Sequence, residues 1–348
     1  MCFNMFLYYF IVLFTFVLCY SEEDLGYSLN IGNAIDVFAN YGDLSQVTQV
    51  ISADYEGEES EDSIVPFSEK NIKVFTNVTS KESGGEADGV TSMELMLCET
   101  FDDLLDAYFK NFKIEGTDKP WKAFMGDWIH DEIMRTFGIE YEIMRNFGID
   151  CCFVLVKLTK MHKTVELGNL NNVGVKDYVM RAIEDLNVKN TADVRRFMKS
   201  YGTHYIHSYA TGNIIYQVFK YKRRGFDLLR SYIAMRNTGQ ASSANLRFYF
   251  SSYFLKQVGD IKIASGNKTI ETWARTNLRD SQYLYSRPSL LRLNYNAVLV
   301  HKLNNLMDNG ALIALNLKTL RPLFRDKRKA DKYAEIVQND LQLWENNA

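Results

Sequence analysis

The stretch that decides the fold reads Phe-Met-Lys-Ser-Tyr-Gly-Thr-His-Tyr-Ile-His-Ser-Tyr-Ala-Thr-Gly-Asn over residues 197–213. Thr191 is a suitable helix N-cap, and the residues from it to about position 200 have the spacing of a short helix. Gly202 permits a tight backbone path directly after that helix. Residues 204–222 then alternate in the manner of one long strand. The sequence therefore predicts a helix that turns abruptly into a strand at Gly202.

Further elements are expected on both sides of this junction. Strands are predicted near 46–53, at 152–158, and from Pro288 through Val300. Helices are predicted at 99–113, 120–146, 175–186 and 226–236 and from 301 onward, whereas 245–255 can also alternate as a strand. Strands interleaved with groups of helices indicate an α+β architecture.

One segment is duplicated in tandem. Residues 132–140 (EIMRTFGIE) are echoed ten positions later by residues 142–150 (EIMRNFGID). Because ten residues at about 100° each fall about 80° short of full turns, one continuous helix would place the two copies on different faces. We expect each copy to end at its own glycine, Gly138 and Gly148, as a helix C-terminus.

Composition sets the broad class. The 348 residues are 47% hydrophobic and 24% charged, which is typical of one or two globular domains. The formal net charge of −3 lacks the strongly basic balance of a nucleic-acid binder, so no nucleic-acid partner is expected.

The first residues indicate the compartment. Residues 5–20 (MFLYYFIVLFTFVLCY) carry no charge and precede an acidic stretch, which predicts a secretory signal peptide over residues 1–21. The alternative is an uncleaved anchor, because the first four residues lack Lys and Arg and the apolar run approaches the roughly 18 residues that span a bilayer. We therefore expect a secreted, extracellular protein, with glycosylation sequons at Asn77 and Asn267.

Three cysteines lie beyond that segment: Cys98, Cys151 and Cys152. A bond between the adjacent pair would need a strained ring, and an odd number cannot pair off within one chain. We expect a disulfide between Cys98 and one of the other two, which leaves one thiol.

Motifs of common enzyme classes are missing from the sequence: it contains no GxSxG, GxxxxGK[ST], HExxH or CxxC pattern. His204 and His207 have no third ligand at metal-binding spacing, so we interpret them as packed, hydrogen-bonded histidines. The run 130–132 (HDE) reads as an exposed polar face. We expect no catalytic residue, metal or cofactor; an enzyme would require a pocket of ionisable groups around His130 or His204.

The run from Tyr201 through Gly202, Thr203 and His204 to Tyr205 resembles the signature Y-G-T-H-[FY] of the membrane-attack-complex/perforin (MACPF) family. Gly212 matches the first of two glycines that follow this signature in the family, and Asn213 replaces the second. The closing Trp…Pro-x-Leu segment of the family is also matched, at Trp273, Pro288, Leu290 and Leu291. The signature residues can pack and hydrogen-bond across a helix-to-strand join, so we interpret them as structural.

The resemblance, which covers roughly residues 25–300, implies a fold. It implies a bent, twisted antiparallel sheet flanked by two helical clusters, here at roughly 98–148 and 223–258. The MACPF domain would occupy residues 22–300, between the signal peptide and a helical C-terminal extension at 301–348.

In pore-forming members of the family, the two clusters unfurl into amphipathic hairpins. A spanning strand needs about 9–11 alternating residues. The second cluster holds one such stretch, a latent membrane hairpin in which Leu246, Phe248, Phe250 and Phe254 face one way. In the first cluster, Asp102, Asp103 and Asp106 interrupt the apolar register. The sequence therefore favours a non-lytic member of the family, and a pore-forming effector is the alternative.

The resemblance extends to developmental members of the family. It implies an extracellular signalling factor that acts locally in a receptor tyrosine kinase pathway, through an extracellular ligand or receptor. A second hypothesis concerns contact with anionic extracellular matrix or a membrane surface. It rests on basic residues of the tail, which can also be read as a solvated helix face: Arg321, Arg325, Lys327, Arg328 and Lys329.

Overall fold

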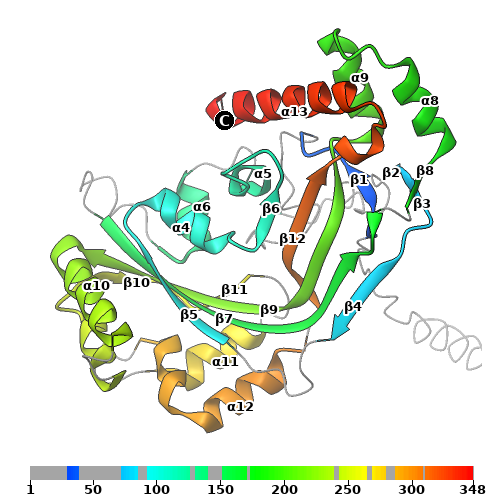
Figure 1. Ribbon diagram of the computed structural model, residues 1–348. Helices are drawn as coiled ribbons and strands as arrows, with labels where there is room; N and C mark the ends of the chain where they lie inside the picture. The colour runs from blue at the N-terminus through cyan, green and yellow to red at the C-terminus, as the bar shows by residue number, and fades with distance from the viewer. Residues whose placement is uncertain are drawn as a thin grey trace, which may run out of the picture.

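The computed structural model describes residues 30–38, 72–84, 92–125, 130–139, 151–170, 173–238, 243–264, 269–279, 287–308 and 310–347. The predicted signal peptide, the strand expected near 46–53, Gly148 and Asn267 lie outside these residues. Within them, a ten-stranded sheet bends around one group of helices and is covered on its other side by a second group (Figure 1). The bent antiparallel sheet with flanking helices confirms the expected α+β fold.

Two long strands form the centre of the sheet. β9 (His204–Lys222) pairs antiparallel with β7 (Cys151–Leu167), from Cys151 opposite Lys222 to Glu166 opposite Ser208. Both predicted strands are therefore present, and the one expected at 152–158 is longer than the sequence indicated. β9 is continuously buried from Gly212 to Tyr221, because successive side chains there enter the two hydrophobic cores on opposite faces of the sheet.

Shorter strands extend this pair on both edges. The outer edge of β7 carries β5 (Ser92–Cys98) and β4 (Ser80–Gly84). The beginning of β9 also pairs with β1 (Asn33–Ile35), which pairs in turn with β2 (Ile72–Lys73). A separate two-stranded sheet joins β3 (Phe75–Thr76) to β8 (Gly174–Val175).

The opposite edge of β9 carries three strands in succession. They are β12 (Ala311–Thr319), β11 (Lys262–Ile263) and β10 (Leu255–Val258), all antiparallel to β9. β12 is followed by β6 (Phe112–Ile114), which runs parallel to it.

The helices form groups on the two faces of the sheet (Figure 1). The first helical cluster lies between β5 and β7 in the chain and contains α4 (Phe101–Tyr108), β6, α5 (Trp121–Met125) and α6 (His130–Thr136). The second helical cluster lies between β9 and β10 and contains α10 (Arg223–Asn237) and the 3₁₀ helix η3 (Ser243–Phe250). Two hydrophobic cores result, and the buried apolar residues of β7 contribute to both.

The remaining helices complete the two layers. On the side of the second cluster lie α11 (Thr269–Asn277), η4 (Leu290–Tyr295) and α12 (Ala297–Leu306). On the other side lie α8 (Asp177–Asp185), α9 (Thr191–Tyr201), η5 (Arg321–Leu323) and α13 (Lys327–Asn347).

For three segments the sequence predicted the wrong type of secondary structure. The strand expected over 288–300 is η4 followed by α12, because Ser289 and Asn296 cap successive helical turns with their side chains. The tail expected to be helical from 301 onward contains β12, a strand paired with both β9 and β6, before α13 begins. The helix expected to reach 113 ends at Tyr108, where the chain turns into β6. In the last two cases pairing with a neighbouring strand overrides local helical spacing.

Helix ends agree more closely with the sequence. Gly138 follows α6 with φ of 67°, so the first copy of the duplicated segment ends at its glycine as expected. α9 begins at Thr191, but Asn190 is the residue that caps it: its side chain accepts a hydrogen bond from the backbone N–H of Ala192 at 3.1 Å.

The close approach of β7 and β9 at their β-bulge requires Gly212. This residue lies opposite Met161, at the point where the register between β7 and β9 shifts by a β-bulge. A Cβ atom at position 212 would overlap the carbonyl oxygen of Lys160. The two backbones therefore approach each other more closely than any side chain would permit.

Replacing Gly212 with alanine should lower the free energy of unfolding by at least about 2 kcal/mol, because the Lys160 backbone must move. Urea unfolding of the purified protein measures this change. Gly84→Ala is the matched control: Gly84 lies in β4, where an added Cβ meets no atom within 4 Å. A Gly212→Ala protein as stable as Gly84→Ala would show that the close approach at position 212 does not require glycine.

Candidate functional site

The family-like signature forms the junction between α9 and β9. Gly202 has φ of 85° and donates its backbone N–H to the carbonyl of Met198 at 2.7 Å, which ends α9. A Cβ atom at this position would lie 3.0 Å from backbone atoms of Ile35 in β1. Glycine is therefore required twice here, for its positive φ and for contact with a neighbouring strand.

Thr203 joins segments that are far apart in the chain. Its hydroxyl oxygen accepts a hydrogen bond from the N–H of Val37 at 3.1 Å, and its own N–H donates to Ile35 at 2.9 Å. Its carbonyl oxygen accepts hydrogen bonds from the N–H of Leu320 at 3.2 Å and the hydroxyl of Tyr333 at 3.1 Å. Thr203 thus ties β1, the end of β12 and α13 to the start of β9.

His204 is completely buried beside it. Its Nε2 lies 2.8 Å from the carbonyl oxygen of Glu115, and its Nδ1 lies 3.0 Å from the Thr203 hydroxyl. Because a carbonyl can only accept, Nε2 must carry the proton, and Nδ1 then accepts from the hydroxyl. Burial lowers the pKa of His204 to about 4, so the ring is neutral at physiological pH.

The other histidine of the pair does not join this site. His207 Nε2 lies 3.6 Å from a carboxylate oxygen of Glu166 in β7. Over the described ranges, no group of three or more His, Cys, Asp or Glu side chains could hold a metal ion. His130 begins α6, and its side chain lies outside the described set.

The two tyrosines of the signature pack against aromatic rings. The Tyr201 ring lies 4.8 Å from that of Phe197 and stacks on Tyr178 at 6.2 Å. The Tyr205 ring meets Phe75 edge-on at 5.2 Å. These contacts, like those of Thr203 and His204, hold elements together.

Sequence reasoning missed Gln217, a buried polar residue of β9. Its amide nitrogen donates to the carbonyl oxygens of Gly259 and Pro288, each at 2.9 Å, and its amide oxygen accepts from Leu290 N at 3.0 Å. It therefore attaches the Pro288–Leu290 segment, which resembles the end of the family motif, directly to the central strand.

Lys157 was also missed. It lies buried in β7, donates its Nζ to the carbonyl oxygen of Tyr108 at 2.9 Å, and sits 5.6 Å from the centre of that residue's ring. Burial lowers its pKa to about 8. A lone lysine within the apolar run 152–158 was the available signal. The hydrogen bond from Lys157 to Tyr108 links α4 to the sheet.

A cavity of about 730 Å³ opens beside β6. Three of the charged groups in its lining have partners: Asp106 accepts from Trp121 Nε1 at 2.7 Å, Lys110 pairs with Glu94, and the Glu115 carboxylate accepts from Thr319. His204 is not among its lining residues.

The residues of the predicted latent hairpin do not form a strand: Leu246, Phe248 and Phe250 lie in η3, and Phe254 lies in the turn that follows it. Leu246, Phe250 and Phe254, four residues apart, are buried against the sheet, whereas Phe248 is 57% exposed. A strand would have placed Phe248 on the same face as the other three. Each helix in the described ranges is too short or too polar to serve as a membrane-spanning segment.

The basic residues of the tail are partly engaged. Arg321 pairs with Asp331, and Lys329 donates to the carbonyl oxygens of Ile183 and Glu184 at the end of α8. The remaining members, Arg325, Lys327 and Arg328, are exposed.

The expected disulfide is not formed. Cys98 and Cys152 are both buried free thiols. Cys98 belongs to the core beneath the first cluster, whereas Cys152 belongs to the core beneath the second, so the two side chains lie on opposite faces of the sheet. Cys151 begins β7, and its side chain lies outside the described set.

Of the two predicted glycosylation sites, Asn77 lies within the part of the chain that the structure describes. It is exposed, with φ of 54°, in the turn between β3 and β4. Asparagine tolerates this left-handed conformation better than most residues.

Comparison with known proteins gives a partial match in sequence. Residues 144–291 match the sequence model of the MAC/Perforin domain. Among curated proteins, no sequence matches the chain.

Solved structures with some similarity include three proteins of different origin. GNIP1Aa from Chromobacterium piscinae shares 9% identity at a TM-score of 0.43, covering 76% of this chain and 47% of its own. A protein described as a candidate cell invasion protein with a MAC/Perforin domain, from Bacteroides thetaiotaomicron, shares 11% identity at 0.39, covering 92% and 61%. Astrotactin-2, a vertebrate-specific, perforin-like membrane protein involved in neuronal development, shares 11% identity at 0.32, covering 75% and 82%. The chain thus spans about half to three-fifths of the length of the first two.

The burial of neutral His204 makes stability depend on pH. The unfolded chain binds a proton at this residue below the ordinary histidine pKa of 6.5, whereas the folded protein does so only near pH 4, so stability should fall as pH drops from 6.5 toward 4. Between pH 7 and pH 4.5 the loss attributable to His204 should be about 2 kcal/mol.

Urea unfolding at the two pH values, compared between wild type and His204→Gln, isolates this share of the pH dependence. The pH-dependent loss should be smaller in His204→Gln by about that amount. His301→Gln, which replaces an exposed histidine of α12, should keep the wild-type difference. Equal pH dependence in all three proteins would contradict the assignment.

Proposed function

We propose that this chain is a secreted, non-lytic MACPF protein that acts outside the cell as a developmental signalling factor. The match of residues 144–291 to the MAC/Perforin (MACPF) domain supports this proposal. Within the family, we infer a resemblance to the insect Torso-like protein. Residues 31–42 resemble the N-terminal region of that protein, and in this structure they include β1, which pairs with the signature at His204 and Tyr205.

That resemblance implies a partner and a process. Torso-like controls locally the activation of a receptor tyrosine kinase, Torso, through its ligand, in patterning the ends of the embryo. We therefore propose an extracellular ligand or receptor of such a pathway as the binding partner, and a role without catalysis. The exposed residues Arg325, Lys327 and Arg328 would add contact with anionic matrix or membrane surface.

The observation that supports a non-lytic role is how firmly the first helical cluster is bonded to the rest of the domain. Its strand β6 pairs in parallel with β12, and Glu115 at its end accepts hydrogen bonds from Thr319 N at 2.8 Å and Oγ1 at 3.0 Å. Thr117 and Lys122 bond to Glu345 in α13. Unfurling this cluster would break these bonds together with the His204 contact to Glu115.

One observation favours the pore-forming alternative. The two clusters are inserted between β5 and β7 and between β9 and β10, and these four strands are neighbours in the sheet. Straightened clusters would extend the same four strands as two adjacent hairpins. Against that, three aspartates within Phe101–Tyr108 would lie along the first hairpin, where charge on the lipid face is costly.

Membrane insertion and partner binding are tested on one preparation of the secreted protein. Dye-loaded liposomes containing phosphatidylserine should release no more than background dye, with a pore-forming MACPF protein as the positive control. In the same preparation, immobilised kinase ectodomain or its ligand should bind the protein, and heparin should compete if the basic tail contributes. Dye release with ring-shaped oligomers would support the alternative, and binding to neither partner would contradict the signalling role.

Secretion itself predicts a glycan at Asn77. Expressed with its own first 21 residues in a eukaryotic host, the protein should appear in the medium, and peptide-N-glycosidase should lower its mass. Asn77→Asp should remove one glycan without disturbing the turn, because aspartate also tolerates positive φ. An intracellular product, or an Asn77→Asp protein of unchanged mass after correction for the substitution, would contradict this prediction.

A further inference from the structure

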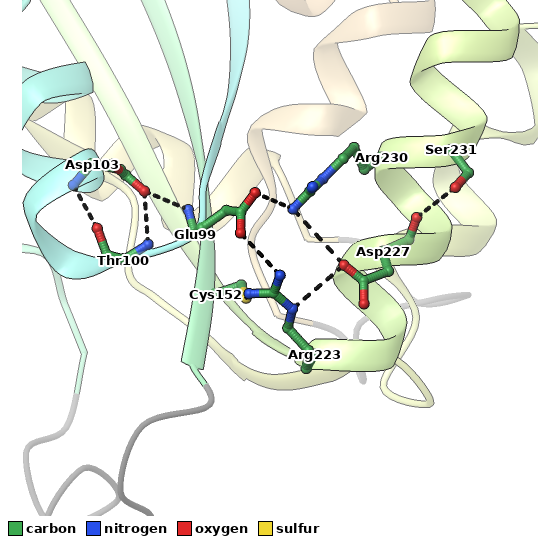
Figure 2. Close-up of polar contacts among 8 residues, drawn as sticks. All are labelled: Glu99, Thr100, Asp103, Cys152, Arg223, Asp227, Arg230 and Ser231. Carbon is green, nitrogen blue, oxygen red and sulfur yellow. Dashed lines mark hydrogen bonds and ion pairs between the residues drawn. The ribbon is translucent and has the colours of Figure 1, made fainter.

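The two helical clusters leave the sheet at the same end. The first leaves after β5 and the second after β9, and the register places Cys98 opposite Phe153 and Cys152 opposite Tyr221. Glu99 and Arg223 are therefore the first residues beyond the ends of two strands that both pair with β7. Figure 2 shows these residues facing each other across that end.

Ion pairs join the clusters there. Arg223 Nη2 lies 2.9 Å and Arg230 Nη2 lies 2.5 Å from the two carboxylate oxygens of Glu99. Asp227, on the same helix as both arginines, lies 3.5 Å from Arg223 Nε and 3.8 Å from Arg230 Nη2 (Figure 2). One carboxylate from the first cluster is thus held by two guanidinium groups from the second.

Further contacts restrict the charged residues of these ion pairs. The backbone N–H of Glu99 donates to Asp103 Oδ2 at 3.0 Å, and Asp103 also takes part in the capping box that begins α4 with Thr100. Arg223 Nη1 lies 3.6 Å from the buried Cys152 sulfur, and the Arg230 guanidinium lies 5.1 Å from the centre of the Phe226 ring. Because these contacts restrict the side chains already, pairing costs less conformational entropy than it does for free surface residues.

We propose that Glu99, Arg223, Asp227 and Arg230 form a latch that couples the two helical clusters, so that neither loosens from the sheet without weakening the other. The clusters pack into different hydrophobic cores on opposite faces of the sheet. The latch is a direct polar link across the end of the sheet between them. The proposed latch is a property of the folded domain and does not depend on the proposed signalling function.

The latch acts at solvent-accessible positions. Its arginines are 43% and 44% exposed, and Glu99 is 44% exposed. Each exposed ion pair contributes little free energy, so the latch affects how often the clusters separate from the sheet and does not hold the fold together. Reversing the charge of Glu99 would place three positive groups near Asp227. The two helical clusters should then separate from the sheet about three- to tenfold more often.

Amide hydrogen exchange of the full-length secreted protein, read by mass spectrometry, tests the coupling. In Glu99→Arg, peptides from Phe101–Tyr108 and from Arg223–Asn237 should exchange about three- to tenfold faster together. Peptides from the paired stretches of β7 and β9 should be unchanged, which shows that the variant is folded. The quadruple variant Glu99→Arg, Arg223→Glu, Asp227→Arg, Arg230→Glu inverts every charge of the latch, so opposite charges face each other again, and it should return both clusters toward the wild-type rate.

The matched control is Glu82→Arg. Glu82 forms a similarly exposed pair with Lys163 at 2.9 Å, between β4 and β7 and outside both clusters. This variant should leave exchange in both clusters unchanged. The proposal is overturned if Glu99→Arg accelerates one cluster alone, if it accelerates neither, or if Glu82→Arg has the same effect.

Salt provides a test without mutation. Raising sodium chloride from about 0.05 M to about 1 M shortens the screening length to about 3 Å, and should accelerate exchange in both clusters of the wild-type protein. Glu99→Gln, a neutral variant of similar shape, should already exchange about twofold faster and respond less to salt. Should Glu99→Arg fail to fold, this pair of measurements decides the question: equal salt responses in wild type and Glu99→Gln overturn the latch.

Discussion

The hydrogen bonds of Thr203 are the interaction on which the arrangement of this domain depends. Its hydroxyl and carbonyl oxygens accept from Val37, Leu320 and Tyr333, each of which lies more than a hundred residues from Thr203 in the chain. These bonds form only because Gly202 adopts a positive φ and brings the backbone against β1. Each neutral bond contributes about 1 kcal/mol net, so their importance lies in fixing which strands and helices meet.

Burial on both faces of β7 and β9 is the second constraint. A sheet covered on both sides cannot expose its polar residues to water, and each must find a partner inside. Gln217 and Lys157 do so by bonding to carbonyl groups of segments that lie over opposite faces. These buried polar groups therefore specify where the covering segments dock, which apolar contact alone would leave less defined.

The same architecture explains why signalling and pore formation are competing proposals for one scaffold. Both clusters lie where straightening would extend the central strands, yet the first is bonded to β12 and α13 as well as to the sheet. An extracellular signalling role needs a stable outer surface, whereas insertion needs clusters that leave the sheet. Hydrogen bonds that must break before release shift that balance toward the stable form.

The sequence by itself determined the α+β class, the long strand β9, the first part of β7 and the helix-to-strand turn at Gly202, because spacing, glycine and apolar alternation are local signals. The positions of the two helical clusters were implied by the family resemblance. Tertiary structure decided what depends on partners distant in the chain. The residues 311–319 became a strand because β9 offers them a paired edge, and Leu246, Phe250 and Phe254 became buried because the sheet lies beneath them. Cys98 and Cys152 remained apart for the same kind of reason, since neighbouring positions on paired strands can face opposite sides of a sheet, and that geometry is absent from residue spacing.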